Sequence, residues 1–144
     1  MKFNPPQNFT IEVGDTVLTG ILQEPTKAQS KQMADIIKAD TQISKEITKV
    51  SNKLELAEAK LAKDTTNEEL IVKVQKLKEE LETLGEKRDY PAMMDEVSKL
   101  RIELTVKGDN YKEIVELAEQ FGYYSVFECI RADIAENKKK DSLV

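Results

Sequence analysis

The side chains that most often carry out chemistry in proteins are scarce in this sequence. Histidine is absent, so the commonest general base near neutral pH and the commonest metal ligand are both missing. Cys129 is the only cysteine, and it stands among apolar neighbours with no histidine to activate it. We therefore expect a buried, unreactive thiol, no internal disulfide, and no zinc site of the histidine or paired-cysteine kind.

The remaining polar motifs do not form a catalytic constellation either. Carboxylates occur in pairs, as at Asp95-Glu96 and Glu68-Glu69, but they stand among many charges on predicted helix faces, which is typical of solvated surface. The five glycines are scattered singly, so no glycine-rich phosphate loop is present. We predict that the protein is not an enzyme and that it uses no cofactor and no metal ion.

Composition and charge favour a protein of long, solvated helices. Charged residues make up 34% of the 144 residues and aromatic residues only 6%. The net charge of -5 argues against nucleic acid or anionic lipid as a partner. No apolar run has the length of a membrane span, and the start of the chain at residues 1–6 lacks the apolar core of a secretory signal. We expect a cytoplasmic protein without membrane contact.

Two ladders of apolar residues with alternating spacings of four and three dominate the sequence. Together they predict two helices folded back on each other as an antiparallel coiled coil, with a polar break at Asp64–Asn67. Thr66, with Glu69 three residues later, is the predicted cap of the second helix. Asp40 interrupts the first ladder and needs a cationic partner, such as a lysine, if it is buried. The ladders comprise Met33, Ile36, Ile43, Ile47, Val50, Leu54, Ala57 and Leu61, followed by Leu70, Val74, Leu77, Leu81 and Leu84.

The N-terminal segment has the alternating pattern of a β-hairpin over residues 9–22. Gly14-Asp15 predicts a two-residue type II′ turn. That turn pairs Ile11 with Leu18 and Phe9 with Gly20, which gathers the apolar side chains on one face. A lone hairpin is only marginally stable in water, so this face must pack on helices, on another chain, or on both.

Three further helices are predicted from Asp89 onward, from capping signals and apolar faces. They begin at Asp89 or Tyr90, at Asn110, and at a capping box formed by Ser125 and Glu128. The fold class is therefore mainly α (α+β), with an N-terminal β-hairpin, an antiparallel coiled-coil helical hairpin and a small C-terminal helical unit. The expected divisions are residues 1–25, 26–88, 89–137 and a tail at 138–144.

Strand edges and unpaired helix seams are the general means by which such elements hold another polypeptide. The hairpin residues and the first seam residues are accordingly candidates for contact with a protein partner or a second copy, and an aromatic pair is a third candidate. The third helix could instead cover the seam within the chain, and a monomer is then expected. The candidate residues are Phe9, Ile11, Val13, Val17, Met33, Ile36, Tyr123 and Tyr124.

The alternative function is DNA binding through residues 110–137. Ala118 stands four residues before Gly122, which is the spacing of many helix-turn-helix modules. The following helix would have to read the major groove, yet its Arg131 stands among Glu128, Asp133 and other acids. The residues therefore favour a plain helical hairpin over a DNA reader.

The order of elements resembles that of phage tail-assembly chaperones. The residues that carry the resemblance are the strand Phe9–Val13, the turn Gly14-Asp15 and the start of the first helix at Pro25–Ala28. The segment Leu117–Val126 is similar in style to small phage morphogenesis proteins, whereas the long coiled-coil ladder departs from the pattern. The resemblance implies transient binding of tail proteins, such as the tape measure, during assembly, and it implies no catalytic residues.

Overall fold

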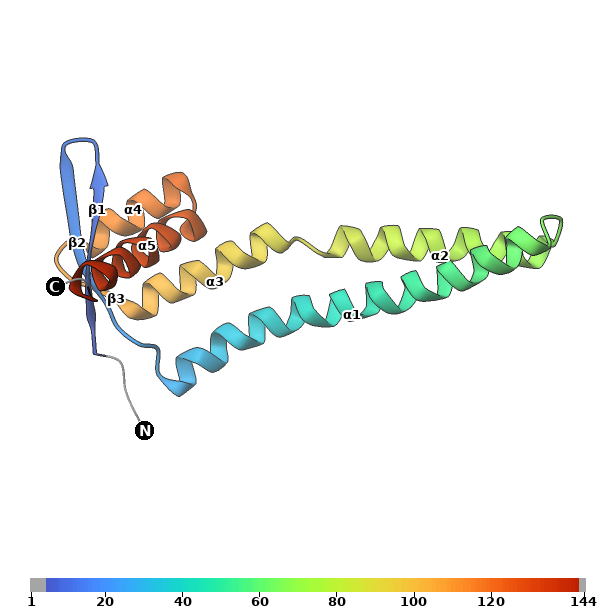
Figure 1. Ribbon diagram of the computed structural model, residues 1–144, viewed down its shortest axis with the longest axis horizontal. Helices are drawn as coiled ribbons and strands as arrows, with labels where there is room; N and C mark the ends of the chain where they lie inside the picture. Colours follow the sequence, from blue (N-terminus) through green and yellow to red (C-terminus); the bar gives the residue numbers. More distant parts are fainter. Residues whose placement is uncertain (1–4, 143–144) are drawn as a thin grey trace. The chain divides into compact units, whose positions relative to one another are not determined.

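The computed structural model describes residues 5–142 of the chain, and 75% of them are helical. This confirms a mainly α protein with an N-terminal sheet and a long helical hairpin (Figure 1). The described residues divide into two units, which we call the mixed unit (residues 5–36 and 91–142) and the coiled-coil unit (residues 37–90). The elements are β1 Gln7–Val13, β2 Thr16–Leu22, α1 Lys27–Lys63, α2 Glu68–Lys87, α3 Tyr90–Thr105, β3 Val106–Lys107, α4 Tyr111–Phe121 and α5 Tyr123–Ser142.

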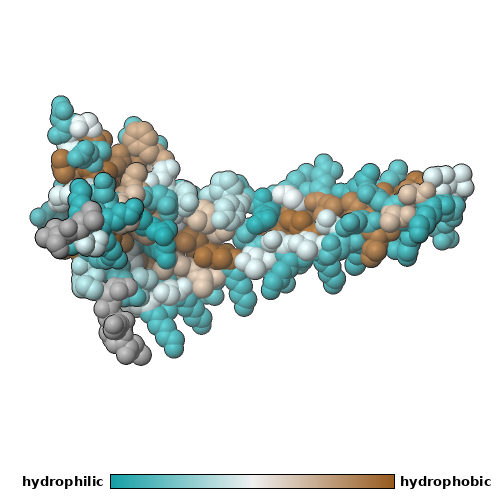
Figure 2. All heavy atoms as spheres, viewed as in Figure 1, coloured by the Kyte–Doolittle hydropathy of each residue, from teal (hydrophilic) through white to brown (hydrophobic). Residues whose placement is uncertain are grey.

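The coiled-coil unit packs α1 against α2 along the predicted seam. Its buried residues alternate between the two helices, and further seam residues are only half-buried beside them. Figure 2 shows the corresponding apolar stripe running between hydrophilic side chains. The buried residues are Val50, Ala57, Val74, Leu77 and Leu84, and the half-buried ones are Ile47, Leu54, Leu61 and Leu81.

Asp40 on this seam has a partner, which is Arg88 rather than a lysine. The guanidinium donates from Nε to Asp40 Oδ1 at 3.1 Å and from Nη2 to Oδ2 at 3.3 Å. The Asp40 side chain is only 11% exposed, so this forked ion pair offsets the cost of removing a carboxylate from water. Arg88 also stacks on Tyr90 at 5.8 Å, and a longer ion pair joins Lys78 to Glu58 at 4.0 Å.

The cap of α2 differs from the predicted one. Asn67, not Thr66, is the N-cap, because its side-chain oxygen accepts from the Leu70 amide at 3.2 Å and the helix begins at Glu68. The predicted pairing of Thr66 with Glu69 is therefore wrong. Thr26 does cap α1, since it exchanges two hydrogen bonds with Gln29, at 2.9 and 3.2 Å.

The β-hairpin has the predicted register, with Ile11 opposite Leu18 and Phe9 opposite Gly20. Gly14 has a φ of 60°, which fits the first central position of a type II′ turn. Among the described residues, only glycines have a positive φ. A Cβ on Gly20 would overlap the Phe9 ring, so this pair requires glycine. A third strand, β3, was not predicted, because two residues carry no periodic signal; it pairs with the end of β2.

The mixed unit has the densest core of the described residues. The hairpin lays its apolar face on helices, with α5 against β1 and α4 against β2 (Figure 1). The largest side chains that are less than 2% exposed come from strands and helices alike, and they are Phe9, Ile102, Thr105, Val106, Ile114 and Ile130. The apolar face of the hairpin thus packs on helices of its own chain, which is one of the predicted alternatives.

The final helix is longer at both ends than the sequence predicts. Gly122 ends α4 with a φ of 99°, as expected, but α5 begins directly at Tyr123, so the predicted capping box at Ser125 and Glu128 is wrong. The helix continues to Ser142, and residues 138–142 are therefore helical rather than a tail. Two short segments lie outside the described part of the chain: residues 143–144, and residues 1–4, which belong to the start that was predicted to lack a secretory signal.

Candidate functional site

Half of the candidate contact residues belong to the interior of the mixed unit. Phe9 is 1% exposed, Ile11 8%, Met33 5% and Tyr123 7%. The prediction placed them at a surface because periodicity marks an apolar face without showing what covers it. Met33 is this deeply buried within the single chain, so the seam at this position is covered without a second chain. Ile36 beside it is half-buried.

The other candidates remain accessible on the hairpin and at the turn between α4 and α5. Val17 is 53% exposed and Val13 38%, and Ile21, which the sequence argument did not single out, is 36% exposed. Strand alternation places Val17 and Ile21 on the sheet face opposite the core. We call this face, formed by Thr10, Glu12, Val17, Thr19 and Ile21, the outer sheet face.

Exposed aromatic side chains flank the turn between α4 and α5. Phe121 is 62% exposed and Tyr124 42%. The Tyr124 amide donates to Asp95 Oδ1 at 3.1 Å, which fixes the turn against α3. Cys129 is exposed rather than buried, so the prediction for its environment is wrong.

Side chains from distant parts of the sequence occupy both edges of the hairpin. The Thr10 amide on β1 donates to Asp133 Oδ2 at 2.9 Å, and the Thr19 amide on β2 donates to Asn110 Oδ1 at 2.9 Å. β3 covers the end of β2 at Ile21. Each edge therefore has fewer backbone groups left to pair with another strand, which favours the outer sheet face as a contact surface.

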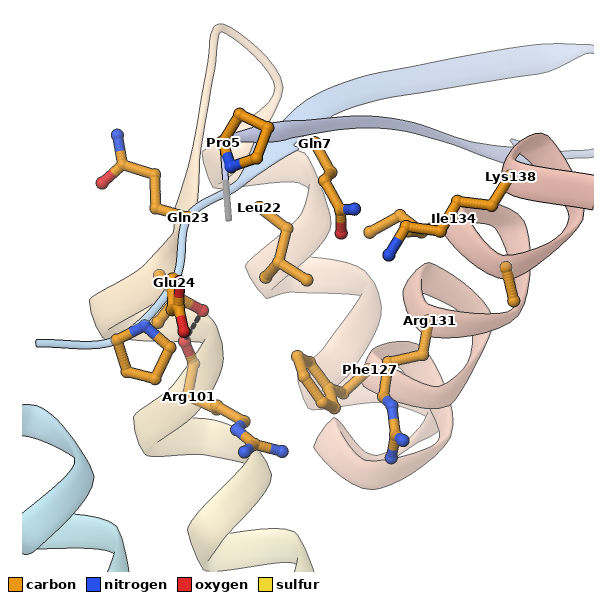
Figure 3. Close-up of a pocket in the computed structure, with 13 residues that line it drawn as sticks. Pro5, Gln7, Leu22, Gln23, Glu24, Arg101, Phe127, Arg131, Ile134 and Lys138 are labelled. Atoms are coloured by element: carbon orange, nitrogen blue, oxygen red, sulfur yellow. Dashed lines mark hydrogen bonds between the residues drawn. The ribbon is translucent and has the colours of Figure 1, made fainter. Parts of the chain in front are cut away.

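A groove of about 400 Å³ opens where the chain leaves strand β2, between α3 and α5. Its floor includes Leu22, Phe127 and Ile134 (Figure 3). Figure 3 shows the Arg101 and Arg131 side chains on either side of the Phe127 ring, reaching from different helices. All of these residues lie in the mixed unit.

The rim of the groove is basic although the chain is acidic. Arg101, Arg131 and Lys138 line it together with one acid, Glu24, while the whole chain has a net charge of -5. Arg101 stacks on the Phe127 ring at 5.2 Å, which orders the guanidinium and leaves its N–H edges available. Arg131 donates from Nη1 to Glu128 at 3.1 Å, and that ion pair is more than 40% exposed on both sides.

Comparison with known proteins adds no family to this picture: no protein-family model, no curated protein and no solved structure matches the chain. Within residues 5–142, no cluster of three or more metal-binding side chains is present. Across the same residues, no helix is long and apolar enough to cross a membrane. The geometry offers three candidate surfaces: the outer sheet face, the aromatic turn and the basic groove.

Sequence reasoning missed the groove because its parts lie far apart along the chain. Leu22, Arg101 and Arg131 belong to three separate elements, and only the packing of those elements brings them together. The one local signal was Arg131, which the sequence argument examined for DNA and set among acids. Arg131 does pair with Glu128, but it also lines the groove together with Arg101, which is 30 positions away and carries no motif.

Proposed function

We propose that the protein is a non-enzymatic interaction and assembly protein of the cytoplasm that binds a protein partner or a second copy through its N-terminal hairpin. The observation that carries the proposal is the outer sheet face. The hairpin is already stabilised by α4 and α5, yet Val17 and Ile21 remain 53% and 36% exposed. Apolar side chains on a rigid, two-stranded platform fit a contact surface.

A tail-assembly chaperone is the specific form of this function that we propose. Its support is the resemblance in element order, namely the hairpin of Phe9–Val13, the turn at Gly14-Asp15 and the helix that starts after Pro25. A chaperone of this kind would bind a tail protein transiently, and it would need apolar contact surface rather than a catalytic site.

The test is capture of a tape-measure segment by the purified chain, with variants of the outer sheet face. Val17→Asp with Ile21→Asp should reduce capture at least tenfold, because two charges would have to be desolvated at the contact. Leu56→Asp is the matched control, since Leu56 is 65% exposed but lies on the coiled-coil unit. Undiminished capture by the double variant would contradict the proposed surface.

A substitution that disrupts the hairpin backbone, such as Ile11→Pro, would not test this contact. Ile11 on β1 lies opposite Leu18 on β2, and its distance from the turn makes the two a hydrogen-bonded pair. Proline there would remove a bond that holds the hairpin together and would unfold the surface under test. Charge substitutions on the outer sheet face leave the ladder intact, so they separate binding from folding.

DNA binding by residues 110–137 remains the competing function. It predicts duplex affinity that falls steeply with added salt and is lost in Arg131→Ala. Fluorescence anisotropy with mixed duplex DNA at low salt measures this directly. Flat titrations are the outcome that our proposal expects, and micromolar binding would favour the competing function.

A further inference from the structure

The groove between the hairpin exit, α3 and α5 combines two kinds of lining that one ligand class would use together. Its floor is apolar, from Leu22, Phe127 and Ile134, and its rim has Arg101, Arg131 and Lys138. A volume of about 400 Å³ is in the range of sites that take a few residues of peptide rather than a single ion. The site is thus shaped for a ligand with both apolar and anionic groups.

The cations of the groove are available for such a ligand. Among residues 5–142, neither Arg101 nor Lys138 forms an ion pair. Arg131 uses one arm of its guanidinium on Glu128 and keeps the other N–H groups free. Because Phe127 holds the Arg101 plane at 5.2 Å, less side-chain entropy is lost when a carboxylate binds it.

Gln7 supplies a neutral contact on the same groove. Figure 3 shows its side chain pointing from β1 toward the space between Leu22 and Ile134. An amide side chain can both donate to and accept from a peptide backbone. Lys138 lies beyond Ile134 on α5, so charged contacts are present toward both ends of the apolar floor (Figure 3).

We propose that this groove binds a short, extended acidic segment of a partner protein, with a carboxylate between Arg101 and Arg131 and an apolar side chain on Phe127 and Leu22. The charge of the rim, three cations against one acid, is the reason for choosing an acidic segment. The inference rests on the proposed function in one respect, that the partner is a protein. It adds a site that is separate from the outer sheet face.

The test uses a capped eight-residue peptide, Leu-Glu-Phe-Asp-Leu-Glu-Phe-Asp, and a neutral peptide in which Gln and Asn replace the acids. Amide shifts of the ¹⁵N-labelled full chain are followed during titration. The acidic peptide should shift amides around Leu22, Phe127 and Ile134, and its affinity should exceed that of the neutral peptide at least tenfold. Added salt should weaken it, because part of the groove is open to solvent.

Two variants separate the groove from general charge. Arg101→Gln with Arg131→Gln should lower the affinity for the acidic peptide at least tenfold, while Lys112→Gln, on the exposed surface of α4, should change it less than twofold. Unchanged spectra away from the groove verify that both variants fold. Equal binding of the two peptides, equal loss in Lys112→Gln, or no shifts at millimolar peptide would overturn the proposal.

Failure of this proposal is distinguishable from failure of the proposed function. Capture of a partner through Val17 with no peptide bound in the groove would remove the groove alone. Peptide binding without any capture through the outer sheet face would remove the proposed contact surface alone. Shifts of the same groove amides by an oligonucleotide, with none by the acidic peptide, would overturn the peptide assignment in favour of a nucleic acid ligand.

Discussion

The two units of this protein use similar apolar residues but bury them to different degrees. In the mixed unit, Phe9, Ile102, Ile114 and Ile130 are no more than 1% exposed, because strands and helices cover them from several sides. In the coiled-coil unit, the seam residues Val50, Val74, Leu77 and Leu84 remain 5–8% exposed, and others are half-buried. In a two-helix coiled coil, each helix covers the seam from one side only, and the flanks of the seam stay open to water. Similar apolar residues are therefore less buried there, and we expect them to contribute less to the free energy of unfolding.

The largest difference in unfolding free energy between the two units is expected when an isoleucine of each is replaced by alanine. Ile130→Ala should cost about 2–5 kcal/mol of unfolding free energy, because Ile130 is 0% exposed and its removal leaves a cavity. Ile47→Ala, at a half-buried seam position, should cost about 1 kcal/mol, since water and neighbouring side chains can fill the space. Urea denaturation measures both. Equal losses would mean that the two cores are equally dense.

Replacing one glycine in each unit by alanine should change stability in opposite directions. Gly20→Ala should destabilise by about 1–3 kcal/mol, because the added methyl would overlap the Phe9 ring. Gly85→Ala should stabilise by about 0.5–1 kcal/mol, because no atom lies within 4 Å of the new methyl and the site is helical. Thermal melts of the two variants decide the point. A destabilised Gly85→Ala would contradict the open surroundings of this position.

Removing the Asp40–Arg88 ion pair of the coiled-coil unit should have a smaller effect on stability. Asp40→Ala should cost about 1–2 kcal/mol, because Arg88 loses a forked partner but remains about a third exposed and can be hydrated. Asp35→Ala on the exposed surface of the same helix is the matched control and should change stability by less than about 0.5 kcal/mol. Both are measured by urea denaturation. A loss in Asp40→Ala no larger than in the control would contradict the pairing.

The regular parts of this fold could be predicted from the sequence, and the long-range contacts could not. Gly14-Asp15 fixed the hairpin register, and the ladders fixed the helical hairpin, because these signals are local and periodic. β3 has two residues and no pattern, and the choice of Asn67 over Thr66 as cap depends on one turn of backbone.

The candidate site was harder to predict than the fold, for a physical reason. Periodicity shows that Phe9 and Ile11 are apolar and share a face, but their exposure depends on α4 and α5, which lie about a hundred residues away. The bonds of Asp133 and Asn110 to the strand edges span 123 and 91 positions. Such contacts carry no local signature, so the sequence could mark the apolar residues of the hairpin but not which of them the helices would cover.

The smallest predicted effect concerns Tyr123 in the mixed unit. Burial, and then the nearby Glu119 carboxylate, raise the pKa of Tyr123 above its ordinary value of 10.0. The unfolded chain therefore loses this proton first, and the stabilising contribution is present below pH 10 and declines as the pH rises through the folded value. Stability should fall less steeply above pH 10 in Tyr123→Phe than in the unchanged protein, as measured by urea denaturation across pH. Parallel declines would contradict the shift.

The central claim is that the outer sheet face of the mixed unit contacts a protein, and the exposed surface of the coiled-coil unit near Leu56 does not. A photo-crosslinking amino acid placed at Val17 or at Leu56, which are 53% and 65% exposed, tests this most directly. Irradiation with a purified tape-measure segment should give one defined adduct from position 17, identified by mass spectrometry, and little from position 56. Equal adducts from both positions, or none from position 17, would contradict the account.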